Sequence, residues 1–212
     1  MTEPVRKRIR LARARAGADP QRFQHDWRRA VEELMDRAQP DAAAVGFALD
    51  DADERYAGVS MAWFADEAHL HAAPDDESLP TAGEVIGLTV DEEIVRGAEW
   101  LGARSTSDEW YLHMALTPRA PGLTRAEFAR RWRDHARGSA NPLPDEIRGL
   151  AYVQNHPRGE APPYDAVNEA HFDDLDGLRH RVDWFREHGI GAEPDELFGV
   201  AAFLALRVER LC

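Results

Sequence analysis

The sequence predicts an α+β fold in which two tandem ferredoxin-like βαββαβ units form a pseudo-dimeric α/β barrel within one chain. The first observation is an internal repeat, because residues 22–27 match residues 127–132 at a spacing of 105. Residues 56–64 match residues 164–172 at a spacing of 108, and a length change in the intervening loop explains the difference. Both copies also show the same order of strand and helix patterns. One such unit leaves one sheet face bare, so two units are expected to bury those faces against each other.

Each element of the second copy follows from a local pattern. Residues 110–117 alternate and end at Pro118, which is typical of a strand. Residues 124–127 form a capping box that begins a helix. Strands are also expected at 149–156, 165–172 and about 198–208, with a second helix whose apolar stripe is Leu175, Leu178, Val182 and Phe185.

The first copy repeats this order more loosely. A strand at 5–12 leads to a helix that Asp19 caps and Pro20 begins. Further strands are expected at 43–49, 56–64 and within 85–95, with a short or broken helix after Asp66. The units are therefore predicted to span 1–101 and 108–212, with the working site in the second.

Composition excludes several classes of function. A net charge of −13 argues against binding to nucleic acid or to an anionic membrane surface. Lys7 is the only lysine, which excludes a Walker-type phosphate loop, and Schiff-base chemistry is set aside because it would rest on Lys7 alone. Cys212 is the only cysteine, so no intrachain disulfide and no cysteine-rich metal site can form. With no leader-like segment and no long apolar run, we expect a cytoplasmic protein.

Strand periodicity predicts which side chains face the barrel interior. On the strand at 110–117, the apolar alternate residues are expected to face the helices, which leaves Tyr111 and His113 facing the barrel. On the strand at 165–172, Glu169 and His171 are expected to face the barrel together with Asp165 and Val167. The small Ala166 and Ala170 on the other face suit close packing against a helix.

The two copies differ in polarity at equivalent positions. Met61 and Trp63 of the first copy align with Glu169 and His171 of the second. The other aligned pairs are Ala57 with Asp165, Ala30 with His135, and Arg8 with His113. One interior wall is therefore expected to be apolar and the other titratable, which indicates one site per chain for a small molecule with an apolar body.

Glu169 and His171 are the first candidates for catalysis. His171 would act as general acid or base with Glu169 as its orienting partner, and His113 or His156 would be the second proton carrier. The candidates for substrate binding are Val59, Met61, Trp63, Tyr111, Tyr152, Asn155, His135, Asp165 and Arg8. The alternative for each residue is a solvated or hydrogen-bonded side chain without a role in function.

The second copy resembles the EthD-like family of the dimeric α/β-barrel superfamily. The resemblance rests on residues 122–135, 152–156 and 163–173, and it covers about residues 108–210. It implies a fused pseudo-dimer that encloses a cavity, in which the family's helix histidine is His135 and its strand Asn-His pair is Asn155 and His156. Relatives include cofactor-free monooxygenases and cyclases of aromatic polyketides, dehydratases, lactone isomerases, haem-handling proteins and members without an assigned reaction. His171 departs from the family, which more often carries Trp at that position.

Three functions remain open from the sequence. The first is a cofactor-independent acid–base enzyme that dehydrates, cyclises or isomerises a small, largely apolar, aromatic or polyketide-like substrate. A cofactor-free monooxygenase of the same substrate class is the alternative reaction. The second is a metal site formed by His113, Glu169 and His171. The third is a non-catalytic small-molecule-binding accessory protein. No organic cofactor, nucleic acid or membrane partner is expected, and the chain is expected to be a monomeric pseudo-dimer or a homodimer.

Overall fold

The computed structural model describes residues 5–49, 55–74, 82–103, 109–137 and 143–211. Eight strands form one closed antiparallel barrel in the order β1-β3-β2-β8-β5-β7-β6-β4. The strands are β1 (Val5–Ala14), β2 (Ala42–Ala48), β3 (Gly58–Phe64), β4 (Ala82–Arg96), β5 (Glu109–Thr117), β6 (Ala151–Pro157), β7 (Ala166–Phe172) and β8 (Ala202–Arg210).

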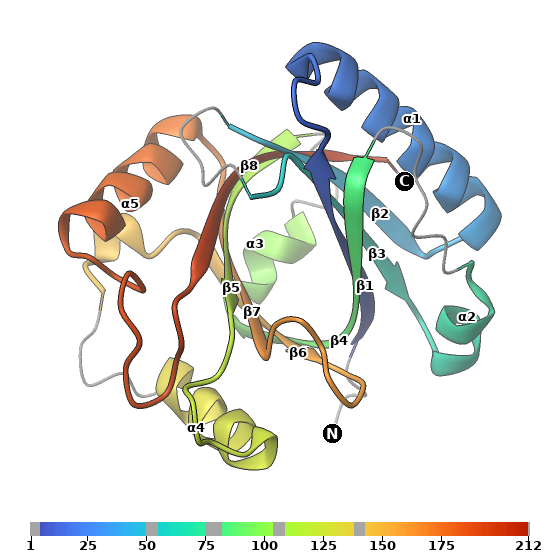
Figure 1. The fold of residues 1–212 in the computed structure, drawn as a ribbon. Coiled ribbons are helices and arrows are strands. Elements are labelled where there is room, and N and C mark those ends of the chain that lie inside the picture. The colour runs from blue at the N-terminus through green and yellow to red at the C-terminus, as the bar shows by residue number, and fades with distance from the viewer. Residues whose placement is uncertain (1–4, 50–54, 75–81, 104–108, 138–142, 212) are drawn as a thin grey trace.

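Four of the five helices in the described residues lie outside the ring of strands, whereas α3 is seen across the opening of the ring (Figure 1). The helices are α1 (Pro20–Ala38), α2 (Glu67–Ala72), α3 (Ala98–Ala103), α4 (Arg125–Arg137) and α5 (Leu175–Glu187), and Asp145–Ile147 forms a short 3-10 turn. The predicted start of α1 is confirmed, because the Asp19 side chain accepts a hydrogen bond from the Arg22 N–H and Pro20 occupies the first turn. The sequence did not predict α3, which follows Gly97 in a positive-φ conformation.

The prediction of two tandem ferredoxin-like units was wrong as a description of the fold. β2 pairs with β8, and β4 pairs with β6, so hydrogen-bonded seams join strands from the two halves of the sequence. The result is one continuous closed sheet around a single interior instead of two sheets that pack face to face. The physical reason is that a separate four-stranded sheet has unpaired backbone N–H and C=O groups on its two edge strands. These groups form hydrogen bonds when the strands close into one barrel. The unit limits 1–101 and 108–212 stay a prediction.

The strand registers decide which side chains face the interior. Leu112 of β5 pairs with His171 of β7, and Met114 pairs with Glu169, so these four side chains share the inner face. The expectation that the apolar residues of β5 face the helices was therefore wrong, and Tyr111 and His113 lie on the outer face. β5 is buried on both faces, and in such a strand alternation alone cannot tell the two sides apart.

Apolar side chains from both halves of the chain fill most of the interior. This core includes Ile9, Met61, Leu88, Val90, Leu112, Met114, Val167, Leu204 and Leu206. Tyr56 and Tyr164, whose hydroxyl oxygens lie 2.9 Å apart, belong to the same core. Among the described residues, no helix is both long enough and apolar enough to cross a membrane.

Candidate functional site

A cavity of about 360 Å³ lies at the end of the barrel interior where α3 contributes to its wall. Its lining is mostly apolar and consists of Ala42, Ala43, Ala44, Trp63, Glu92, Ile94, Ala98, Leu101, Gly102, Trp110, Val153, Glu169, His171 and Arg210. The volume is at the lower end of the range of about 300–1,000 Å³ that small-molecule pockets occupy. An apolar wall with four polar or charged side chains suits a small molecule that is held by its body and oriented by few groups.

Lys7 lies beneath this cavity as a fully buried cation. Its ammonium Nζ donates to Glu169 Oε1 at 2.6 Å and to Glu92 Oε2 at 2.9 Å. It also lies 4.7 Å from the centroid of the Trp63 ring, in cation–π geometry. Burial alone would lower the pKa of Lys7, but the charges of Glu169 and Glu92 outweigh it and raise the pKa above its ordinary value. Lys7 therefore stays charged across the physiological range.

Glu169 receives hydrogen bonds and charge from three neighbours. Its Oε1 accepts from Lys7 and from the Asn155 Nδ2 at 2.8 Å, and its Oε2 lies 3.3 Å from the His171 Nε2. Burial would raise the pKa of Glu169, but the charge of Lys7 holds it well below its usual range. The carboxylate is therefore ionised although only 1% of its side chain is exposed.

His171 is the titratable group that faces the cavity from β7. Its ring centroid lies 5.9 Å from that of Trp100, which α3 places against the interior. An imidazole beside a fixed carboxylate can accept a proton from a ligand, because the carboxylate stabilises the imidazolium that forms. We call Lys7, Glu92, Glu169 and His171 the barrel cluster.

Glu92 joins the barrel cluster to the apolar wall. Its Oε2 accepts from Lys7 and from the Trp63 indole Nε1 at 3.0 Å. This hydrogen bond holds the Trp63 ring, which lines the cavity.

The structure brings some of the predicted site residues together in the interior. Glu169, His171 and Trp63 line the cavity, and Asn155 supports Glu169 from below. Val59 and Met61 also face the interior, where they form part of the apolar core instead of the cavity wall. The roles of these residues in catalysis or binding stay predictions.

His113 lies outside the barrel, between β5 and α5. The Arg181 Nε donates to its Nδ1 at 2.9 Å, and its ring stacks on Phe203 at 5.2 Å and meets Phe185 edge-on. Burial, with the charge of Arg181, lowers the pKa of His113 well below its ordinary value, so this histidine is neutral. We call His113, Arg181, Phe185 and Phe203 the α5 cluster.

The predicted metal set does not assemble. His113 is on the opposite face of the sheet from Glu169 and His171, so the three side chains cannot share one ion. No group of three or more His, Cys, Asp or Glu side chains within the described parts of the chain is arranged to hold a metal.

His156, the alternative proton carrier, also points away from the interior. Its ring packs edge-on against Trp132 of α4 at 4.5 Å, and its Nε2 lies 3.3 Å from Glu93 Oε2. Burial, with the charge of Arg133, lowers the pKa of His156. His156 alternates with Asn155 along β6, which explains why the two lie on different faces.

Four more of the predicted binding residues lie outside the barrel. Tyr111 and Tyr152 pack near α5 with Leu175 and Val182, and burial raises the pKa of Tyr152 to about 12. His135 is exposed on α4, and Asp165 accepts from Arg119. The pattern of polar residues in the sequence predicted these four side chains to face the cavity. The strand register and the loops instead direct them away from it.

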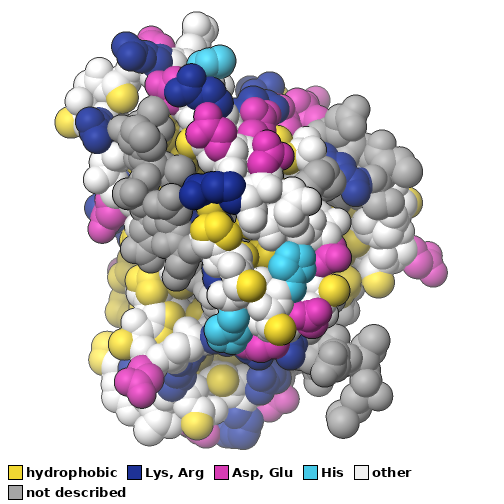
Figure 2. Space-filling view, turned by 90° about the vertical axis from the view of Figure 1, so that its right-hand side faces the viewer, with side chains coloured by type: hydrophobic (Ala, Val, Ile, Leu, Met, Phe, Trp, Pro, Cys, Tyr) yellow, Lys and Arg dark blue, Asp and Glu magenta, His cyan; other side chains and the backbone are white. Residues whose placement is uncertain are grey.

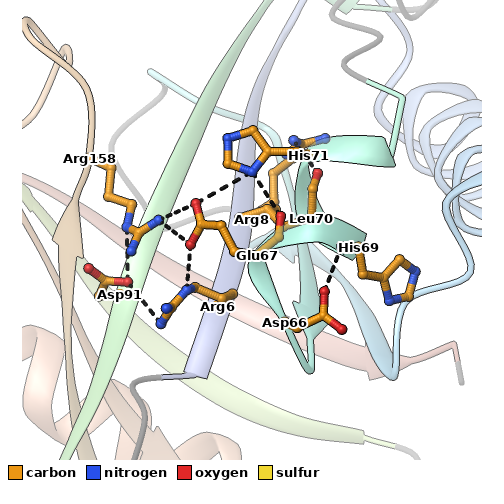
Figure 3. Close-up of polar contacts among 9 residues, drawn as sticks. All are labelled: Arg6, Arg8, Asp66, Glu67, His69, Leu70, His71, Asp91 and Arg158. Atoms are coloured by element: carbon orange, nitrogen blue, oxygen red, sulfur yellow. Dashed lines mark hydrogen bonds and ion pairs between the residues drawn. The ribbon is translucent and has the colours of Figure 1, made fainter.

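Arg8 holds α2 against the barrel instead of binding in the interior. Its guanidinium donates to the carbonyl oxygen of Leu70 in α2 (Figure 3). It also donates to the carbonyl oxygens of Ala73 and Pro74, which follow α2. Arg8 alternates with Lys7 on β1, so the adjacent lysine is the residue that faces inward.

A charged network lies on the outer surface beside Arg8. Glu67 of α2 accepts from Arg6 at 2.7 Å and from Arg158 at 2.6 Å, and Asp91 lies 3.0 Å from Arg158 (Figure 3). Figure 2 shows the side of the molecule that carries α1 and α2, where acidic and basic side chains are interspersed with histidines. This surface network joins α2 to β1, β4 and the end of β6.

Sequence reasoning missed Lys7, Glu92, Trp110 and Arg210, all of which belong to the cavity or its support. One signal was present, because Lys7 alternates with Ile9 and Leu11, whereas Arg6, Arg8 and Arg10 occupy the other face of the strand. A lone lysine in an apolar register indicates a buried, paired cation. Glu92 carried no such signal, since its position depends on the β4–β6 seam.

Comparison with known proteins shows similarity in fold. A solved structure from Fusobacterium nucleatum subsp. nucleatum, described as a "Putative monooxygenase", shares 11% identity and a TM-score of 0.51, covering 99% of this chain and 94% of that one. A second from Lactobacillus acidophilus, similarly described, shares 10% identity and a TM-score of 0.49, covering 97% and 94%. No family model and no curated protein matches the chain, so membership of the EthD-like family stays a prediction.

Proposed function

We propose that the chain is a cofactor-independent acid–base enzyme that moves a proton on a small, largely apolar substrate in the barrel cavity. The observation that carries this proposal is the pair formed by His171 and the ionised Glu169 on the cavity wall. Trp63 and Trp110 supply apolar surface for the body of the substrate.

The chemistry requires only proton transfer. His171 removes a proton from an acidic C–H or O–H of the substrate, and Glu169 stabilises the resulting imidazolium at 3.3 Å. Return of the proton to another atom isomerises the substrate, and its delivery to a hydroxyl leaving group releases water. Lys7 supports this step because its charge keeps Glu169 ionised in the interior. Dehydration, cyclisation and isomerisation of a ring-forming ketone all begin in this way.

A cofactor-free monooxygenase is the second candidate, and the description of the Fusobacterium nucleatum structure favours it. The same proton removal would give a substrate carbanion that reacts with molecular oxygen. In a balanced reaction, a CH₂ group and O₂ give a carbonyl group and one water, with no other reductant. Both candidates therefore share the His171 step and differ in the need for oxygen.

Proton exchange tests the shared step without knowledge of the natural substrate. We expect the wild-type protein to accelerate exchange of the α-protons of 2-tetralone in D₂O, followed by ¹H NMR. His171→Gln should slow the catalysed exchange by roughly 10²–10⁴-fold, the usual contribution of a positioned acid or base. Glu169→Gln should also slow it, whereas His113→Gln in the α5 cluster should leave it unchanged.

Oxygen separates the two candidates. Exchange without consumption of oxygen favours the isomerase-type reaction, whereas oxygen uptake with a product containing C=O in place of CH₂ favours the monooxygenase. Exchange that is equally fast in wild type and His171→Gln contradicts the proposal. If the same protein binds 2-tetralone tightly, that result would favour a non-catalytic binding function.

A further inference from the structure

The charges of the cavity wall are unevenly distributed. Glu92 and Glu169 lie over Lys7, so carboxylates surround that part of the interior. Arg210 of β8 is the only Lys or Arg among the described residues that line the cavity. β8 is four strands from β4 in the closed ring of eight, so Arg210 and Glu92 project from opposite walls.

The strand registers separate Arg210 from His171 along the sheet. Leu112 pairs with both His171 of β7 and Leu206 of β8, which sets these two residues at one level. Arg210 lies four residues beyond Leu206 along β8, a distance of about 13 Å at roughly 3.3 Å per residue. It pairs with Ala44, whose small side chain leaves room beside the guanidinium.

The rest of the cavity wall is mostly apolar and carries two indole rings. Trp63 and Trp110 come from β3 and β5, and Val153 and Leu101 also line the cavity. Indole rings favour flat, polarisable ligands with which they can stack or make edge contacts. The space between Arg210 and His171 therefore suits an elongated ring system more than a branched one.

We propose that the cavity binds an elongated, planar aromatic carboxylic acid, with its carboxylate on Arg210 and an ionisable hydroxyl or enolisable group at His171. This inference rests on the proposed function and names its substrate class. A guanidinium carries five N–H donors in a planar fork, so Arg210 can hold a carboxylate beside its contacts within the chain.

The charge distribution also sets the orientation of this ligand. A carboxylate at the His171 end of the cavity would face Glu169 and Glu92, and the repulsion between like charges is strong where little water screens it. A hydroxyl or a C–H group at that end is neutral before His171 removes its proton. The acid therefore binds with its uncharged end at His171 and its carboxylate at Arg210.

Binding of 6-hydroxy-2-naphthoic acid and of its uncharged amide, 6-hydroxy-2-naphthamide, tests the inference. These probes are flat, carry the two groups at opposite ends and differ only in the replacement of the carboxylate by an uncharged amide. Isothermal titration should show that the wild-type protein binds the acid at least about tenfold more tightly than the amide, as a charge-assisted pair predicts. Arg210→Gln should abolish this preference, and Arg210→Lys should keep part of it because the charge remains.

Arg207→Gln is the matched control, because Arg207 lies on the outer face of the same strand, with Glu109 and Glu209 as partners. It should leave the preference for the acid unchanged. Equal affinity for acid and amide in the wild type, or an unchanged preference in a folded Arg210→Gln protein, overturns the inference. Circular dichroism identifies a variant that fails to fold. If Arg210→Gln fails to fold, the inference is tested by whether Arg210→Lys keeps part of the preference for the acid.

The His171→Gln variant separates this inference from the proposed function. It should keep the preference for the acid while it loses proton exchange on 2-tetralone. Exchange that depends on His171 without a preference for the acid overturns the carboxylate site alone. A preference that depends on Arg210, without exchange that depends on His171, overturns the acid–base function alone.

Discussion

The barrel cluster and the α5 cluster both bury a cation beside a histidine, but the first borders a cavity and the second is packed among aromatic rings. In the barrel cluster, Lys7 is paired with two carboxylates, and His171 borders open space. In the α5 cluster, Arg181 is paired with the neutral His113 and a carbonyl oxygen, and aromatic rings cover both. A buried histidine therefore indicates a site only when space for a ligand lies beside it.

The two clusters also differ in how they compensate charge. Burial lowers the pKa of Arg181 to about 10, and no carboxylate within the described residues forms an ion pair with it. Hydrogen bonds to His113 and to the Ile147 carbonyl oxygen replace a counter-ion. Lys7 instead depends on Glu92 and Glu169, so the barrel cluster is sensitive to the loss of any one charge.

Removal of the Lys7 charge is the largest expected perturbation. Lys7→Met should lower the free energy of unfolding by about 3–5 kcal/mol, because it leaves two carboxylates in the interior without their cation. Urea unfolding monitored by tryptophan fluorescence measures this change. The combined variant Lys7→Met, Glu92→Gln, Glu169→Gln should recover most of the loss, since no buried charge then remains. A loss of only about 1 kcal/mol, as for an exposed ion pair, would show that the cluster is hydrated.

The contrast between these clusters also explains what the sequence could predict. The alternation of Glu169 and His171 with the small Ala166 and Ala170 placed both titratable residues in the interior, where the structure has them. The same reasoning failed for His113, because β5 carries apolar or aromatic residues on both faces and its register is set by β7 and β8. Both strands alternate, but β5 has Ala115 on its outer face and large apolar residues on its inner face, so its pattern predicts the wrong orientation.

Other features depend on contacts between distant parts of the chain. The closing pairs β2·β8 and β4·β6 bring Arg210 beside Ala44 and Glu92 beside Asn155, and no local pattern predicts such pairing. Helix α3 is only six residues long and lacks fully buried side chains. Its sequence therefore has no amphipathic stripe from which the helix could be predicted. The order of strands and helices was predictable from period and turn residues, whereas the closed sheet and the full cavity wall were not.

Acidification should affect the two clusters in different pH ranges. The folded-state pKa of His113 is lowered, so its contribution to stability is present above the unfolded value of about 6.5 and is lost as pH falls below it. Urea unfolding measures the free energy of unfolding of wild type and of His113→Gln between pH 7.5 and 5. The difference between the two proteins should decrease by up to about 1.4 kcal/mol per pH unit as the pH falls.

Glu169 provides the matched comparison for this pH series. Its folded-state pKa is also lowered, so its contribution is present above the unfolded value of about 4.3 and is lost only as pH falls below that value. The free energy of unfolding of wild type relative to Glu169→Gln should therefore show no decline from pH 7.5 to 5. If the difference from wild type declines in parallel for both variants, the titration of other groups controls the loss of stability at low pH.

The surface network around Glu67 should show the smallest effect and the strongest dependence on salt. Glu67 contacts Arg6 and Arg158 but is 41% exposed, so Glu67→Gln should shift the urea midpoint slightly at low ionic strength. At about 1 M NaCl, where the Debye length is about 3 Å, this shift should disappear. The loss caused by Lys7→Met should persist at the same salt concentration, because ions screen buried pairs much less. A Glu67→Gln effect that resists salt would mean that this network orders α2 through packing, and that exposure alone does not separate it from the barrel cluster.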